Sequence, residues 1–201
     1  MNLKRAIALA CLASTAMTAT AAHADDWTDK WIVRGGFSTV DPKGRNLQLT
    51  PATDVTVDKK TSFTFDVTYL FTENWGVELL AAYPFEHDID TRTNGVRTAF
   101  GSVKHLPPTL SLQYHMNPNG KFRPYVGAGV NYTLFSSEEP NGLSLDDSFG
   151  LAIGGGIDYM LGRHALLNFS IKHIDIDADA KLNGADIGTV AIDPMVYGIN
   201  F

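Results

Sequence analysis

The sequence predicts an all-β protein, an eight-stranded antiparallel β-barrel that spans a membrane. Between residues 62 and 75, apolar and polar residues alternate almost without error, which puts an apolar row on one face of a strand and a polar row on the other. The same alternation recurs along a chain that opens with an export signal and ends on Phe201. In a transmembrane barrel the apolar rows face lipid and the polar rows face the interior.

The first 24 residues are predicted to be a signal peptide. Lys4 and Arg5 precede an apolar stretch that reaches Met17, and residues 22–24 (Ala-His-Ala) form a small-residue cleavage site. This apolar stretch is too short to cross a bilayer as an anchoring helix. Residues 25–201 are then the barrel domain, and the chain's single cysteine leaves with the signal.

Composition excludes several classes of protein. The chain has 22 acidic and 16 basic residues, a net charge of −6, and removal of Lys4 and Arg5 takes it to −8 (−6 minus 2). This balance argues against a nucleic-acid surface. No segment after the signal approaches the ~18 consecutive apolar residues of a transmembrane helix. We expect neither a nucleic-acid partner nor a cofactor.

Eight segments are long enough for tilted membrane strands, which need ~9–11 residues each. The first four, with outward apolar residues in parentheses, are 31–40 (Trp31, Val33, Phe37), 63–71 (Phe63, Phe65, Phe71), 75–85 (Trp75, Val77, Leu79) and 109–116 (Leu110, Leu112, Tyr114). The last four are 122–135 (Val126, Val130, Tyr132), 149–160 (Leu151, Ile153, Ile157), 165–174 (Leu167, Phe169, Ile171) and 188–201 (Tyr197, Ile199, Phe201).

The links between these segments alternate in length. Short turns, such as Asn117-Pro-Asn-Gly120, join strands two to three, four to five and six to seven. The other links are longer and polar, and we expect solvated loops there, at residues 41–61, 86–107, 136–148 and 175–187. Short turns at one end and long loops at the other are typical of bacterial outer-membrane barrels.

A soluble eight-stranded barrel is the competing interpretation, since it would bury Phe63 and Phe65 and expose the polar rows. Aromatic residues near the short turns favour a membrane girdle instead. That predicted girdle consists of Trp75, Tyr114, Tyr125, Tyr159 and Tyr197.

No motif predicts an enzyme or a metal centre. The sequence lacks a Gly-x-Ser-x-Gly elbow, and five histidines are scattered over loops and different strands, namely His87, His105, His115, His164 and His173. Asp175, Asp177, Asp179 and Asp186 have the spacing of a calcium loop, but Ala180 occupies the position of the required glycine. A solvated acidic loop is the favoured interpretation, and no catalytic residue is assigned.

Charged residues of both signs occupy inward positions. Unpaired charges in an interior are costly, so we expect these groups to pair and to close a lumen too narrow for free diffusion. The predicted polar plug consists of Arg34, Asp66, Glu78, Arg123, Asp158 and Lys172.

Several segments, in the expected order, resemble the OmpW family of outer-membrane proteins. Residues 106–115 (Leu-Pro-Pro-Thr-Leu-Ser-Leu-Gln-Tyr-His) and 122–133 (Phe-Arg-Pro-Tyr-Val-Gly-Ala-Gly-Val-Asn-Tyr-Thr) carry the resemblance most specifically. Residues 76–82 (Gly-Val-Glu-Leu-Leu-Ala-Ala), 175–177 and 193–194 match as well. The family includes AlkL-type proteins associated with hydrocarbon uptake.

This resemblance implies a function. It implies an apolar pocket that is open to the outside, blocked below by polar residues, and provided with a sideways exit into the bilayer. The implied pocket residue is Leu80, and Leu70, Ala82 and Ala152 share its inward face. The chain departs from the family where some members carry an aromatic residue and this one has Lys172.

We therefore expect passive transport of small hydrophobic molecules across the bacterial outer membrane. The expected partners are outer-membrane lipid and lipopolysaccharide, apolar solutes, and the assembly machinery, which would recognise Phe201. The alternative is a structural, adhesion or receptor barrel that acts through its extracellular loops.

Overall fold

The computed structural model describes residues 30–201. The predicted signal peptide lies outside these residues. Within them, no helix has the length and apolar character needed to cross a membrane. Residues 32–201 form one compact unit, which is described below.

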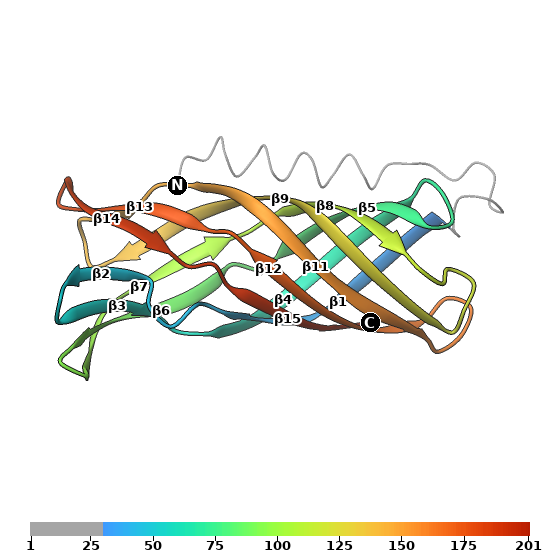
Figure 1. The fold of residues 1–201 in the computed structure, drawn as a ribbon, viewed down its shortest axis with the longest axis horizontal. Coiled ribbons are helices and arrows are strands. Elements are labelled where there is room, and N and C mark those ends of the chain that lie inside the picture. The colour runs from blue at the N-terminus through green and yellow to red at the C-terminus, as the bar shows by residue number, and fades with distance from the viewer. Residues whose placement is uncertain (1–29) are drawn as a thin grey trace. The chain divides into compact units, whose positions relative to one another are not determined.

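Eight antiparallel strands close into a barrel, as predicted. They are β1 (Trp31–Asp41), β4 (Lys60–Leu70), β5 (Trp75–Ala82), β8 (Thr109–His115), β9 (Phe122–Glu139), β11 (Ser148–Met160), β12 (Leu166–Ile174) and β15 (Met195–Asn200). Each strand pairs with the next in this order, and β15 pairs back onto β1, so the ring has no free edge. Figure 1 shows these strands tilted around the long axis.

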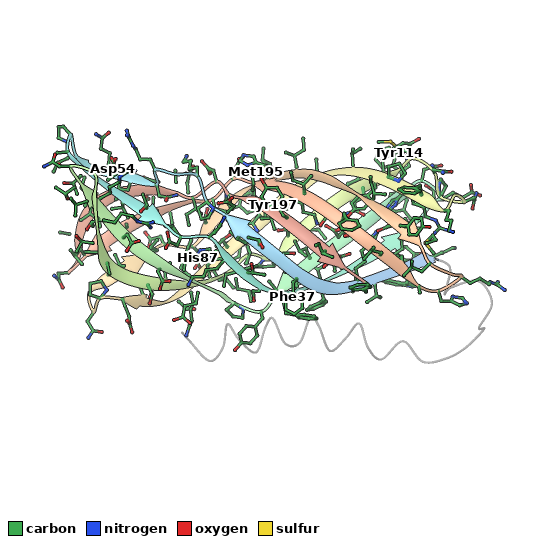
Figure 2. All side chains as sticks on the ribbon, turned by 90° about the horizontal axis from the view of Figure 1, so that it is seen from below. Phe37, Asp54, His87, Tyr114, Met195 and Tyr197 are labelled. Atoms are coloured by element: carbon green, nitrogen blue, oxygen red, sulfur yellow. The ribbon has the colours of Figure 1, made fainter. Side chains whose placement is uncertain are left out.

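The polar rows face inward and the apolar rows face outward. On β4, Thr64, Asp66 and Thr68 are buried, whereas Phe63 and Phe65 are 48% and 43% exposed. Phe37 on β1 likewise projects from the outer surface (Figure 2). A soluble barrel requires the opposite arrangement, so the competing interpretation is wrong.

The short turns lie at one end of the barrel, and most of the aromatic residues of the predicted girdle lie on the outer surface of the barrel. Trp75 and Tyr114 pack edge to face with ring centroids 5.0 Å apart, and both are exposed. Tyr125 is an exception, since it lies inside the barrel and is 3% exposed. Its assignment to the girdle was wrong because its position on β9 puts it in the inward row, two residues before Gly127.

The long links are not solvated loops, and this prediction was wrong. They form seven further strands, β2 (Leu47–Thr50), β3 (Thr53–Val57), β6 (Phe85–Thr93), β7 (Val96–Leu106), β10 (Leu143–Leu145), β13 (Asp177–Leu182) and β14 (Ala185–Ala191). Strands β7, β6, β3 and β2 continue the sheet from β9, and β10, β13 and β14 form a second sheet. We call these seven strands the extension; most are labelled together at the left of Figure 1.

The extension folds because its strands also alternate. On β6, Phe85, His87 and Ile89 point inward while charged residues between them point outward, and Val55 and Val57 do the same on β3. These inward residues and the inward residues at the adjacent end of the barrel form one apolar core. It includes Val40, Val103, Ile174, Ile176, Ile192 and Val196. The extension therefore has a buried interior of its own.

Phe201 follows β15 at the seam where the barrel closes. Its backbone exchanges hydrogen bonds of 2.8 and 2.9 Å with Gly35 on β1, and its side chain is 68% exposed. The recognition of this residue by assembly machinery stays a prediction.

Candidate solute-binding site

The lower interior, toward the short turns, is polar and tightly bonded. Arg34 is fully buried, and its guanidinium donates two hydrogen bonds to Asp158, of 2.9 and 2.6 Å, and one of 2.7 Å to Asp66. A further bond of 3.1 Å reaches the Thr68 hydroxyl. The bidentate geometry compensates for removing these charges from water.

A second ion pair lies next to the first in the barrel interior. The Lys172 ammonium donates to Glu78, and the Gln113 amide donates to the other oxygen of this carboxylate at 2.6 Å. Because Glu78 pairs across the sheet with Thr68, a ligand of Arg34, the two clusters occupy adjacent levels of the barrel. We call them together the ion-pair layer.

Uncharged side chains connect and support this layer. The Asn168 amide donates to Asp158 at 2.7 Å and to the Tyr125 hydroxyl at 3.0 Å. Gly156 leaves the space for that phenol, since a Cβ built on it would lie 2.5 Å from the Tyr125 oxygen. The glycine run on β11 thus serves close interior packing.

Five of the six predicted plug residues come together in the ion-pair layer. Arg123 is the cross-strand partner of Asp158, but its partly buried side chain turns away and donates from its Nε to the carbonyl of Gly120 in a short turn at 3.0 Å. Its predicted role in closing the lumen is a prediction that the geometry leaves to experiment.

The predicted pocket residues fall on both sides of the ion-pair layer. Leu80 points inward and pairs across the ladder with Asp66 of the ion-pair layer, whereas Ala82 and Ala152 lie further out, at the apolar core. Leu70 pairs with Gly76 beside a short turn, beyond the layer. The structure thus places two of these four residues at the apolar core, one beside the layer and one beyond it; their contact with a ligand stays a prediction.

The apolar core of the extension contains a cavity that sequence reasoning missed. It has a volume of about 40 Å³, and Thr91 is its one polar lining residue. Its walls include Leu47, Val57, Ile89, Val103, Leu145 and Ile187, from six strands. Mostly apolar walls are typical of ligand pockets. The spacing of two between Val55 and Val57 and between Leu143 and Leu145 was the available signal.

Two histidines stack on each other next to residues that line this cavity, so the prediction of unclustered histidines was wrong for them. The rings of His87 and His105 stack with centroids 4.8 Å apart and planes 11° apart, and Phe85 stacks on His105 at 5.5 Å. Both imidazoles are almost completely buried.

Burial sets the protonation state of this histidine pair. It lowers the pKa of His105 to about 3, with a smaller contribution from His87. It also lowers the pKa of His87, although a hydrogen bond to the carbonyl of Asp58 acts in the opposite direction. Both rings are therefore neutral at pH 7.

The acidic segment with calcium-loop spacing lies in and beside the second sheet, which consists of β10, β13 and β14. Asp179 on β13 accepts a hydrogen bond from the Thr189 hydroxyl, and Asp186 accepts one from the backbone of Gly188, each at 2.8 Å. Within residues 30–201, no three His, Cys, Asp or Glu side chains are grouped so that they could hold a metal ion.

Comparisons with known proteins agree with this architecture. The OmpW family matches residues 28–201. Outer membrane protein W of Escherichia coli K12 is 40% identical over 205 residues, which cover 95% of each chain. The crystal structure of OprG from Pseudomonas aeruginosa has a TM-score of 0.75 and 39% identity, over 85% of this chain and 93% of that one. A more distant relative, at 28% identity over 86% of this chain and 88% of its own length, is the "dibenzothiophene metabolism operon protein PahQ" of Pseudomonas aeruginosa.

These matches extend over the whole barrel and its extension. They place the protein in the bacterial outer membrane, with its apolar outer rows against lipid, among barrels rather than enzymes. The chain belongs to the OmpW family of outer-membrane proteins.

Proposed function

We propose that this barrel passively transports small hydrophobic molecules, which enter the cavity of the extension and leave sideways into the bilayer above the ion-pair layer. One observation carries the proposal. The apolar core runs from the cavity to Ala152, and toward the short turns buried hydroxyl and amide groups and then the buried ion pairs fill the interior.

The energetics favour a sideways exit over an axial one. An apolar solute that moved toward the periplasm would have to separate Arg34 from its carboxylates or Lys172 from Glu78. Breaking a buried ion pair costs about 3–5 kcal/mol, and an apolar solute offers nothing in exchange. Transfer of such a solute from water into the bilayer, by contrast, is favourable by about 0.8 kcal/mol for each CH₂ group.

A relative's name supports the same class of solute. PahQ is named for a dibenzothiophene metabolism operon, and dibenzothiophene is an apolar aromatic compound. For the present chain we infer solutes of comparable polarity, since the cavity walls are almost entirely hydrocarbon.

Uptake of a medium-chain alkane by cells that lack native homologues tests the proposal. The unaltered protein should raise the rate above that of an empty vector. Leu80→Glu places a carboxylate on the route beside Asp66 and should remove most of the increase. Leu70→Glu is the matched control, since it adds the same charge at an inward position of the neighbouring strand β4, beyond the ion-pair layer.

Heat-modifiable gel mobility verifies that each variant is folded. If folded Leu70→Glu also abolishes uptake, the solute passes through the ion-pair layer and the sideways exit is wrong. If the folded, unaltered protein gives the vector's rate, transport is rejected and the adhesion or structural role becomes the better account.

A further inference from the structure

We propose that the His87–His105 pair is a hydrogen-bonding anchor that selects, among small apolar molecules, those that carry one hydroxyl group. The inference defines the solute class of the proposed function, and it rests on the cavity's admitting apolar solutes. Its basis is the unused hydrogen-bonding capacity of two buried neutral rings, which neighbour residues that line an otherwise apolar cavity.

The tautomer of His87 follows from its one polar contact. Its Nδ1 bonds to the backbone carbonyl of Asp58. A carbonyl oxygen only accepts, so Nδ1 carries the proton and Nε2 carries the lone pair. Among residues 30–201, nothing donates a hydrogen bond to this Nε2, although it is buried. His87 therefore presents a free acceptor.

His105 adds a donor and a second acceptor. Neither of its ring nitrogens has a hydrogen-bond partner in the described part of the chain. The two rings cannot satisfy each other, because they stack at 11° and the N–H bonds and lone pairs of an imidazole lie in the ring plane. Buried polar atoms are rarely left unsatisfied, and such exceptions call for an explanation.

The pair lies next to residues that line the cavity. Ile89 is the next inward residue after His87 on β6, and it lines the cavity. Val103, which pairs with His87 across the ladder, lines it as well. Val57, which precedes the Asp58 carbonyl that holds the ring, lines it too. In Figure 2, His87 lies between Asp54 at the tip of the extension and Phe37 on the barrel.

A hydroxyl group matches these atoms chemically. It can donate its proton to Nε2 of His87 and accept the N–H of His105, while its hydrocarbon chain occupies the cavity. An alkane would leave the nitrogens unsatisfied. An anionic carboxylate would lose its hydration without meeting a positive charge, because both rings are neutral at pH 7.

Nitrogen NMR of the protein in lipid nanodiscs, with ¹⁵N-labelled histidine, tests the anchor directly. The probes are 1-octanol, n-octane and methyl octyl ether, which has an oxygen but no proton to donate. The lone-pair nitrogen of His87 should move upfield with octanol and stay in place with octane and the ether. The signal is assigned by its loss in His87→Phe, which keeps an aromatic ring at this position.

Uptake measurements supply the functional test. The unaltered protein should prefer octanol to octane by about tenfold, the selectivity that one net hydrogen bond provides. His87→Phe and His105→Phe should each take up octane as before and lose the preference. His164→Phe, at an exposed position beside a short turn, is the control and should keep it.

The outcomes separate the two proposals. Uptake of octane and octanol at equal rates, without a nitrogen shift, overturns the anchor and leaves transport intact. A nitrogen shift with octanol but no uptake of either solute supports the anchor and rejects transport. If the phenylalanine variants keep the preference for octanol, the histidines do not cause it and the anchor is rejected.

Discussion

The barrel's lower interior and the interior of the extension solve the same problem in opposite ways. Each fills a space enclosed by strands, but the lower interior uses charged side chains that pair with one another, whereas the extension uses hydrocarbon and leaves a cavity. In the proposed function, the first arrangement excludes an apolar solute because entry would break ion pairs, and the second admits one because nothing polar has to be separated.

The comparison teaches where specificity can arise. In the ion-pair layer the charged groups are bonded to one another, so the layer holds the barrel closed and offers little to a ligand. In the extension the walls discriminate weakly, since one methylene in an apolar pocket changes affinity only modestly. Discrimination there depends on the histidine pair, whose nitrogens retain unused bonding capacity.

The largest effect should come from breaking the lower interior. Arg34→Met removes the cation between Asp66 and Asp158 and leaves two buried carboxylates without it. We expect a loss of about 3–5 kcal/mol in the free energy of unfolding. Urea titration of the refolded barrel, followed by heat-modifiable mobility, measures it. Adding Asp66→Asn and Asp158→Asn should restore much of the loss, and an unchanged midpoint for Arg34→Met would contradict this account.

The next effect should break the extension and spare the barrel. Ile176→Ala removes a side chain that is 1% exposed in the apolar core, and large-to-small changes of this kind cost about 2–5 kcal/mol. Amide hydrogen exchange on β13 and β14 should accelerate, while exchange on β4 and β5 stays slow. Ile153→Ala, at a lipid-facing position, should leave exchange in the extension unchanged. Equal acceleration in both regions would show that they unfold as one unit.

Acidic pH should weaken the extension by a smaller amount. The folded pKa of His105 is about 3, below its ordinary value of 6.5, so the unfolded form binds the extra proton first. Stability is complete above pH 6.5 and falls as the pH drops from 6.5 toward 3, by about 2 kcal/mol at pH 5. Hydrogen exchange on β6 and β7 at pH 7 and pH 5 measures the loss. His105→Phe should remove most of this dependence, and an equal dependence in that variant would assign it to other groups.

The sequence was sufficient for the barrel because lipid imposes a strict pattern on its outer rows. It was insufficient for the extension, where charged residues such as Asp88 and Asp90 separate the inward ones and make strands resemble loops. The turn Asn94-Gly95, in which both residues have positive φ, marks the β6–β7 hairpin. Regular pairing outward from that turn would place Phe85 opposite Lys104, but a bulge at Ile89–Asp90 shifts the register by one residue and brings Phe85 opposite His105. The histidine pair therefore could not be read from the sequence without knowledge of this bulge.

The partners within the ion-pair layer were beyond sequence reasoning for a different reason. Arg34 and Asp158 are 124 positions apart, and they meet only because the ring of strands closes through β15 and β1. Alternation gives the direction of a side chain, but its level in the barrel depends on the register of every strand between. The same limit applies to Leu70 and Leu80, which point inward from neighbouring strands but lie at different levels, one beside a short turn and the other beside Asp66.

The smallest effect should come from a single hydrogen bond that supports this layer. Tyr125→Phe removes the hydroxyl that accepts from Asn168 but keeps the ring that stacks on His115 at 5.3 Å and lies under the Arg34 guanidinium at 5.2 Å. We expect a loss of about 1 kcal/mol, because Asn168 keeps its bond to Asp158. Tyr125→Ala also removes the ring and should cost several times more, about 3–5 kcal/mol. If the two variants unfold at the same urea concentration, the hydroxyl rather than the ring holds the layer, and closure of the lower interior depends on hydrogen bonds more than on packing.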